Sequence, residues 1–262
     1  MSDHTQSDSN QTDSNQEVLA RMRRQTRRSF FVAGVAGLAG FSFFEWLTSR
    51  RLEDKIPWPM RRVFGINEGF WRDWSSPKHV APDFAGKVPL EDHVNSDIGL
   101  EGPLVPADWK LTVSGLADSE GGYEMTLDDL RKMPRTTITT EFKCVEGWSA
   151  VMEWTGVRFS DFMAAHPPRK YNDALPPYVF MQTPDKVYYV SVDMESMQHP
   201  QTLLAYEMNG APLTEDHGAP LRMVTPVKYG LKQIKRIGSI RYQLDRGADY
   251  WTERGYDWYV GL

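Results

Sequence analysis

Hydrophobic residues are nearly absent from the first twenty positions and then dominate one stretch of the chain. Residues 1–20 consist mostly of Ser, Asp, Asn, Gln and Thr, so they cannot bury a core and are expected to be disordered. Five arginines lie between Arg21 and Arg28, and an apolar run rich in Gly and Ala extends from Phe30 to Leu47. This order of polar tail, basic cluster and apolar run sets residues 21–49 apart from the rest of the chain.

The run Thr26-Arg-Arg-Ser-Phe-Phe31 has the features of a twin-arginine export signal. A buried helix of the globular part is the alternative, but the arginine cluster and the polar tail disfavour it. As a helix, residues 30–47 would rise about 27 Å, close to the thickness of a bilayer core, and no Ala-x-Ala cleavage site follows them. We therefore expect export to the periplasm by the twin-arginine route. Residues 30–47 are expected to be retained as an anchor in the cytoplasmic membrane, with cleavage as the alternative.

The rest of the chain alternates short apolar segments with turn residues. Residues 50–87 carry four prolines among aromatic residues, which predicts an irregular strap that wraps a domain or lines a site. Residues 88–262 are expected to form the main domain. The 17 prolines and 20 glycines favour short strands joined by turns over a helical bundle.

Strands are predicted where apolar and β-branched residues alternate, and short helices where capping residues precede an amphipathic run. The predicted strands cover residues 109–115, 136–145, 178–183, 187–192 and 220–225. The predicted helices cover residues 125–133 with Thr126 as N-cap, the second half of 154–163, and 200–206 before an Asn209-Gly210 turn. These elements predict an α+β fold that is mostly β.

Cys144 is the only cysteine of the chain, so it forms no internal disulfide and no Cys-x-x-Cys metal site. Covalent haem c is excluded for the same reason. The predicted strand 136–145 delivers this thiol at its end, beside Lys143 and close to Gly147 and Trp148. A thiolate near a cation suits one soft metal whose other ligands come from elsewhere, whereas a buried free cysteine that packs as a small hydrophobe is the alternative. Twin-arginine export favours the metal, because that route carries folded proteins with an inserted cofactor.

The charge and composition of the chain limit the classes of partner that it can bind. The net charge is −5 and the pI is about 5.7, so nucleic acid is a poor partner. The segment from Asp249 to Tyr259 is unusually aromatic, and its rings are expected to pack over the domain, with a docking surface as the alternative.

Two glycine-bearing segments in the second half carry basic residues. One is His217-Gly-Ala-Pro-Leu-Arg222, and the other is Lys228-Tyr-Gly-Leu-Lys232. Backbone N–H groups with arginine and lysine side chains can surround a phosphate, although ordinary surface charge beside two strands would give the same pattern. Neither segment is a Walker loop or a dinucleotide fingerprint.

Taken together, these segments resemble the molybdopterin-binding domain of the sulfite oxidase family over roughly residues 60–245. The matching segments, in this order, are Trp109 to Gly115, Leu127 to Leu130, Phe142 to Trp148, Trp154-Thr-Gly-Val, Thr202 to Gly210, His217 to Arg222 and Lys228 to Lys232. Within the family, Cys144-Val-Glu-Gly-Trp-Ser149 is most similar to the exported catalytic subunits of bacterial periplasmic protein-methionine-sulfoxide reductases.

The resemblance implies one molybdenum–molybdopterin cofactor per chain, with Cys144 as a molybdenum ligand and as the catalytic residue. It also implies that the cofactor is bound by Thr183, by Arg222 and by the loop of Gly230, Leu231 and Lys232. His217 stands where the reductase subunits have an asparagine, and it is expected to contact the pterin phosphate. Asn67, Phe70 and Trp71 lie where those subunits have an Asn-x-x-Tyr-Glu stretch, of which only Asn67 is shared.

Three functions remain open from the sequence. The first is reduction of a sulfoxide or a similar S- or N-oxide, small or protein-bound, with electrons from a membrane-bound haem or flavin subunit. The second is oxidation of sulfite or another small oxyanion, which would need several arginines, such as Arg158, Arg222, Arg236 and Arg241, in one pocket. The third is a binding module that has kept the fold without its cofactor.

Overall fold

The computed structural model describes residues 4–53, 55–74, 79–86, 93–94, 96–102, 105, 108–119 and 121–262. Side chains are described from residue 24 on, apart from residues 25 and 74. The chain divides into two compact units, residues Met1–Arg61 and Arg62–Leu262. The boundary therefore falls inside the segment 50–87 that the sequence predicts as a strap.

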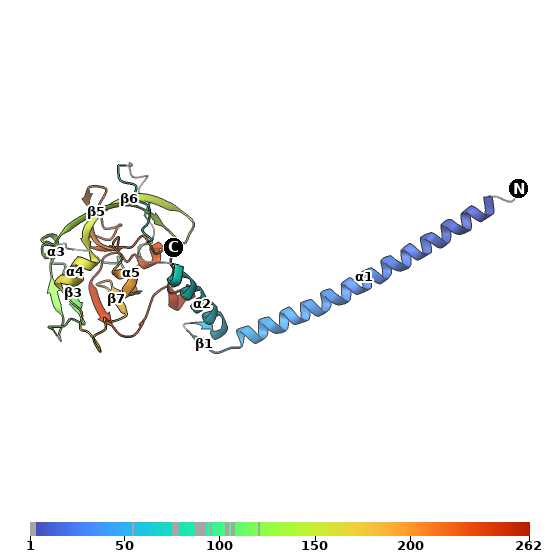
Figure 1. Cartoon of the computed structure of the whole chain (residues 1–262), viewed down its shortest axis with the longest axis horizontal. Helices are drawn as coiled ribbons and strands as arrows, with labels where there is room; N and C mark the ends of the chain where they lie inside the picture. Colours follow the sequence, from blue (N-terminus) through green and yellow to red (C-terminus); the bar gives the residue numbers. More distant parts are fainter. Residues whose placement is uncertain are drawn as a thin grey trace. The chain divides into compact units, whose positions relative to one another are not determined.

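The first unit contains one long helix, α1 (His4–Thr48), drawn in dark and light blue in Figure 1. Its part Thr26–Thr48 is long and apolar enough to cross a membrane, although a signal sequence would pass the same test. The structure differs from the disorder expected for residues 1–20 in that it describes α1 from His4 on. Helix formation is cooperative, so once the apolar part has nucleated the helix, each further residue adds a hydrogen bond even in a polar sequence.

The irregular strap predicted for residues 50–87 is wrong in part. Two short strands, β1 (Leu52–Glu53) and β2 (Ile56–Pro57), pair antiparallel, and helix α2 (Trp58–Trp74) follows them. Pro59 lies in the first turn of α2, where backbone N–H groups have no partner within the helix. A proline there begins a helix rather than excluding one, and this explains why the proline-rich sequence was misinterpreted.

The first sheet of the second unit holds the predicted cysteine strand. Its strand order is β10-β9-β6-β5, and β11 pairs with β9. The bounds are β5 (Arg135–Lys143), β6 (Ser149–Arg158), β9 (Leu203–Met208), β10 (Ala211–Pro212) and β11 (Arg222–Val224). Strand β5 corresponds to the strand predicted to end at the thiol, and it forms a hairpin with β6 in which Lys143 lies opposite Ser149.

The second sheet has the strand order β4-β3-β12-β7-β8. Its members are β3 (Leu111–Ser114), β4 (Tyr123–Met125), β7 (Tyr178–Gln182), β8 (Tyr189–Asp193) and β12 (Ser239–Gln243). All pairs are antiparallel except β3 with β12. The predicted strands at 109–115, 178–183 and 187–192 are therefore confirmed, and so is the α+β fold.

One apolar core joins the two sheets. Val113 and Ile240 of the second sheet belong to the same buried cluster as Val157 and Leu204 of the first. Helices α3 (Leu127–Arg131), α4 (Phe159–Ala165) and α5 (Met194–Met197) contribute to this cluster. As predicted, Thr126 caps α3, and it forms a capping box with Asp129. Asn209 and Gly210, both at positive φ, make the predicted turn between β9 and β10.

The helix predicted for residues 200–206 is wrong, because Leu203–Met208 is strand β9. Five of its six residues are buried, since the strand lies between β6 on one side and β10 and β11 on the other. A short, continuous apolar run has no period that distinguishes a buried strand from a helix.

The aromatic segment near the C-terminus packs onto the second unit, as expected. Trp258 and Tyr259 are buried, and two short 3-10 helices, η1 (Gly230–Lys232) and η2 (Thr252–Arg254), lie in this part of the fold. Backbone hydrogen bonds join Tyr229 to Val260 and Leu262 to Val227. Residues 256–262 are thereby held against the loop that carries η1.

A substitution at Gly156 tests how closely β6 approaches β9. A β-carbon at this position would lie 2.1 Å from the carbonyl oxygen of Leu204. Gly156→Ala should therefore lower the free energy of unfolding by about 2 kcal/mol, because strand β9 would have to move. Chemical unfolding followed by circular dichroism measures the change.

Gly65→Ala is the matched control for this substitution. Gly65 lies in α2, and a β-carbon there would meet no neighbouring atom within 4 Å, so alanine should raise stability by up to about 1 kcal/mol. Equal stability of the Gly156→Ala protein and the unchanged protein would contradict the described approach of the two strands.

Candidate functional site

Cys144 lies directly after β5, at the first position of the turn between β5 and β6. Its N–H donates to the carbonyl oxygen of Trp148 at 3.0 Å, and its own carbonyl oxygen accepts from Gly147 N–H at 3.2 Å. Gly147 has φ of 91°, a conformation that glycine adopts without strain. The cysteine is only 6% exposed and packs in a second apolar cluster with Phe142 and Trp154.

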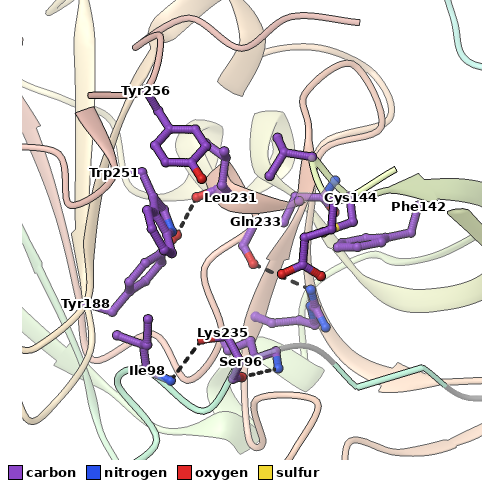
Figure 2. A pocket seen from close by; sticks show the side chains of 14 residues that line it. Ser96, Ile98, Phe142, Cys144, Tyr188, Leu231, Gln233, Lys235, Trp251 and Tyr256 are labelled. Atoms are coloured by element: carbon purple, nitrogen blue, oxygen red, sulfur yellow. Dashed lines mark hydrogen bonds between the residues drawn. The ribbon is translucent and has the colours of Figure 1, made fainter. Parts of the chain in front are cut away.

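The cysteine borders two pockets. The first, called here the main pocket, encloses about 700 Å³ including its open mouth. Figure 2 shows Tyr188, Trp251 and Tyr256 on the side opposite Phe142 and Cys144. The full lining comprises Ser96, Ile98, Phe142, Cys144, Val145, Glu146, Tyr188, Arg222, Gly230, Leu231, Gln233, Lys235, Trp251 and Tyr256.

The second pocket, called here the side pocket, shares Cys144 and Val145 with the main pocket. It encloses about 650 Å³ including open space. The turn residues supply most of its wall and Tyr229 supplies the rest, so that Lys143, Cys144, Val145, Gly147, Trp148, Ser149 and Tyr229 line it. The indole N–H of Trp148 donates to the Glu146 carboxylate at 3.1 Å, which fixes the ring beside the cysteine.

Arg222 brings a buried positive charge to the main pocket. It is 4% exposed, and its guanidinium donates to the carbonyl oxygens of His217 at 3.1 Å and Gln233 at 3.5 Å. The guanidinium carbon also lies 4.6 Å from the ring centroid of Trp154. Burial lowers the pKa of Arg222 to about 10. Its Nε is buried without a hydrogen-bond partner, and no carboxylate among the described residues forms an ion pair with it.

Lys235 is the second cation of the main pocket. Its Nζ donates to the carbonyl oxygen of Ser96 at 2.9 Å. Burial, followed by the positive charge of Arg222, lowers the pKa of Lys235 to about 8. An anion in the pocket would raise the pKa of Lys235, since an opposite charge stabilises the protonated amine.

His217 lies next to this pair of cations. It lines a small third pocket together with His93, Phe142, Met152, Arg222 and Lys235. Its Nδ1 lies 2.8 Å from the hydroxyl oxygen of Thr214. The structure thus places Arg222, Gly230 and Leu231 in the main pocket with Cys144, and His217 in the third pocket with Arg222.

Thr183 does not line the pockets formed by the described residues. Its hydroxyl bonds the Asp185 carboxylate at 2.5 Å and the backbone N–H of Tyr188 at 3.1 Å. The hydroxyl of Tyr188, in turn, donates to the carbonyl oxygen of Leu231 at 2.5 Å. Thr183 therefore supports the wall of the main pocket through Tyr188.

The lysines that the sequence placed around a phosphate have aspartate partners. The ammonium group of Lys232 bonds the Asp249 carboxylate and, at 3.0 Å, the carbonyl oxygen of Ser191. Lys228 lies 3.0 Å from the carboxylate of Asp193, and burial outweighs this attraction and lowers the pKa of Lys228 to about 8. Both side chains are about 1% exposed and belong to the support beneath η1.

Of the three predicted residues of α2, Asn67 and Trp71 lie against the C-terminal segment, and none of the three lines the described pockets. Asn67 donates to the Asp257 carboxylate at 2.8 Å, and Trp71 lies close to Gly261. Phe70 is 60% exposed. Asn67 nevertheless acts close to the site, because Asp257 follows Tyr256 of the main pocket.

The sequence did not identify several of the residues that line the main pocket. Tyr188, Gln233, Trp251 and Tyr256 carry no local motif, although the aromatic run from Asp249 to Tyr259 was a signal for the last two. Within the described residues, no group of three His, Cys, Asp or Glu side chains could hold a metal ion.

Comparison with known proteins gives the family. The family model for the oxidoreductase molybdopterin binding domain matches residues 99–251, more than half of the chain. A protein of Azospira oryzae provisionally named protein-methionine-sulfoxide reductase subunit YedZ1 is 35% identical over 94% of this chain and 89% of its own length. The protein-methionine-sulfoxide reductase catalytic subunit MsrP of Ralstonia nicotianae is 33% identical over 86% of this chain and 71% of its own.

Among solved structures, the sulfane dehydrogenase SoxCD from Paracoccus pantotrophus matches 55% of this chain and 40% of that chain, with a TM-score of 0.49 and 23% identity. The family assignment rests on the sequence matches, which cover most of the chain. The family model includes every pocket residue that lies between Gly99 and Trp251. The chain therefore belongs to the family of oxidoreductases with a molybdopterin-binding domain of the sulfite oxidase type.

Proposed function

We propose that this protein is a molybdenum–molybdopterin-dependent reductase of S-oxides, with Cys144 as the protein ligand of the metal. The observation that carries the proposal is the position of the only thiol, where the main pocket and the side pocket meet. A cofactor in the main pocket and a substrate in the side pocket would both lie beside Cys144. The names of the two long-matching relatives, both protein-methionine-sulfoxide reductase subunits, support the S-oxide as substrate.

The main pocket suits an anionic, flat cofactor, one per chain. The buried charge of Arg222 has no carboxylate partner among the described residues, and a phosphate would supply the missing anion. Tyr188, Trp251 and Tyr256 offer aromatic faces for a ring system. When bound, the molybdenum cofactor supplies the two-electron oxygen-atom transfer.

The protein residues have separate tasks in this proposal. Cys144 binds the metal through a soft thiolate, and Arg222, Lys235 and His217 hold the charged part of the pterin. Gly230 allows the backbone to lie close to Phe142, since a β-carbon there would lie 2.4 Å from the ring, and Leu231 lines the pocket beside it. Thr183 and Lys232 keep Tyr188 and η1 in place.

The side pocket is proposed to receive the substrate. Its mouth is wide and formed by a turn on the surface, so a sulfoxide on a small molecule or on a protein side chain has access. The ring of Trp148 provides an apolar surface for the groups attached to sulfur. Tyr229 and Lys143 carry the polar hydrogens that a sulfoxide oxygen accepts.

The alternative activity, oxidation of a small oxyanion, receives less support from the arginines. Of the four candidates, only Arg222 lines the described pockets. Arg236 donates to the carbonyl oxygens of Leu100 and Gly102, and Arg158 and Arg241 are exposed. A binding module without a cofactor is disfavoured as well, because it would leave the charge of Arg222 buried without an anion.

The N-terminal helix suggests where the reaction takes place. We place the enzyme at the periplasmic face of the cytoplasmic membrane, exported through Arg27 and Arg28 and anchored by residues 30–47. A membrane-bound haem or flavin subunit would then deliver electrons, because this chain has no motif for a second redox centre. Anchoring both proteins in one membrane raises their effective concentration.

Replacing the thiol tests the metal-ligand assignment. Cys144→Ser should abolish sulfoxide reduction and lower the molybdenum content, while the pterin remains bound by its charged contacts. Elemental analysis and pterin fluorescence after oxidation measure the two separately. Arg222→Ala should instead lower the pterin content, and Arg241→Ala, on the exposed side of β12, is the matched control. Full activity of the Cys144→Ser protein would refute the assignment.

Lys235 gives a pH-dependent signature in protein prepared without the cofactor. Its pKa is about 8 in the folded protein against an ordinary value of 10.5, so the unfolded state binds more protons between these pH values. The free energy of unfolding should therefore rise with pH across this interval. Lys235→Met should reduce the rise, as measured by urea unfolding. Lys228 is unchanged in both proteins, so the difference reports on Lys235, and parallel pH curves would contradict its described environment.

The export route can be tested in cells. Replacing both Arg27 and Arg28 with lysine should retain the protein in the cytoplasm, because the receptor of this route reads the arginine pair. Cell fractionation and immunoblotting measure the distribution. Arg50→Lys with Arg51→Lys is the control, and unchanged export of the first variant would contradict the proposed route.

A further inference from the structure

Helix α2 has apolar residues on two opposite faces. On one face, Phe64 and Trp71 are half-buried and Glu68 is 7% exposed. On the other face, Val63, Ile66 and Phe70 are 62%, 74% and 60% exposed. Their spacing of three and four residues places these three side chains in one row along the helix. We call this row the α2 stripe.

The inner face of α2 already packs on other residues of the second unit, called here the catalytic unit. The α2 stripe is therefore not needed for folding. Glu68 forms an ion pair with Arg246, Asn67 bonds Asp257, and the Arg72 guanidinium lies 5.9 Å from the ring centroid of Tyr259. These contacts hold the helix in one orientation. The stripe is therefore presented to the outside as a fixed surface.

A soluble protein gains nothing from exposing three large apolar side chains in a row. Single exposed apolar residues are common, but a contiguous set on one helix face marks a surface that is covered by something. The occupant must therefore be sought near the helix.

The chain itself indicates the occupant. Only nine residues separate the end of α1, whose part Thr26–Thr48 is long and apolar enough to span a bilayer, from the start of α2. Even fully extended, such a connection reaches about 30 Å, so a membrane-anchored α1 keeps α2 within reach of the bilayer surface. Basic residues supply six of the ten charges between Ser49 and Asp73, and one of the four acidic residues, Glu68, is buried in its ion pair.

We propose that the α2 stripe lies on the anionic surface of the membrane that α1 anchors. Val63, Ile66 and Phe70 enter the boundary between headgroups and acyl chains, and Arg62, exposed beside them, faces the phosphates. The inference rests on the proposed anchoring by α1. Its consequence is that the catalytic unit is held in one orientation on the membrane, rather than hanging from a loose tether.

The test uses the full chain reconstituted into vesicles of phosphatidylethanolamine and phosphatidylglycerol. A fluorescent amino acid, introduced by genetic code expansion at position 66 or 70, leaves Cys144 untouched. Nitroxide-labelled lipids then report contact by quenching. Position 244 is the matched control, since Leu244 is an apolar residue of the same unit with 49% exposure.

Quenching several-fold stronger at positions 66 and 70 than at 244 is the expected result. Protein that floats with the vesicles but shows equal, weak quenching at all three positions would overturn the proposal and leave the anchoring intact. Protein that does not float would overturn both. If the label at position 66 became shielded from solvent only after a membrane subunit was added, the stripe would be assigned to a protein partner instead. None of these readouts depends on molybdenum or on turnover, so a failure of the proposed reductase activity would be seen separately.

Discussion

The antiparallel pairing of β5 with β6 determines where the thiol lies, and the remainder of the site is arranged around that point. Nine residue pairs, from Arg135 opposite Val157 to Lys143 opposite Ser149, fix the register of the hairpin. Because side chains alternate along a strand, a slip of one residue would turn Phe142 and Met152 away from their cluster. The same register places Cys144 in the turn, where the residue lines both the main pocket and the side pocket.

Buried charges in the second unit fall into two classes. Lys228 and Lys232 each have an aspartate partner, and these pairs join η1 to β8 and to the C-terminal segment. Breaking such a pair leaves an uncompensated buried charge, so their role is to fix the backbone beneath the pocket. Arg222 has carbonyl oxygens and aromatic rings around it but no carboxylate among the described residues. Lys228 and Lys232 therefore support the fold through ion pairs, whereas Arg222 is the cation that the proposed function assigns to an anionic cofactor.

Local sequence patterns predicted the elements that depend on residues close to one another in the sequence. The threonine-rich alternation identified β5, and Thr126 with Asp129 identified the start of α3. Strand β9 and helix α2 were missed, because burial on both sides removed the period of one and a proline in the first turn obscured the other. The same limit applies to the site. Arg222, Gly230 and Leu231 were predicted to lie with Cys144, whereas the partner of the Lys232 ammonium depends on Asp249, which no local motif connects to it.

The C-terminal segment explains why this pocket requires a completed fold. Trp251 and Tyr256 form one wall of the main pocket, while Cys144 and Phe142 form the opposite wall. The segment that carries the first wall is held by Lys232 through Asp249 and by α2 through Asp257. The pocket cannot form before residues 249–262 have been synthesised and placed, so a cofactor can be enclosed only by the folded chain. The export route proposed for this chain carries folded proteins and would therefore meet this requirement.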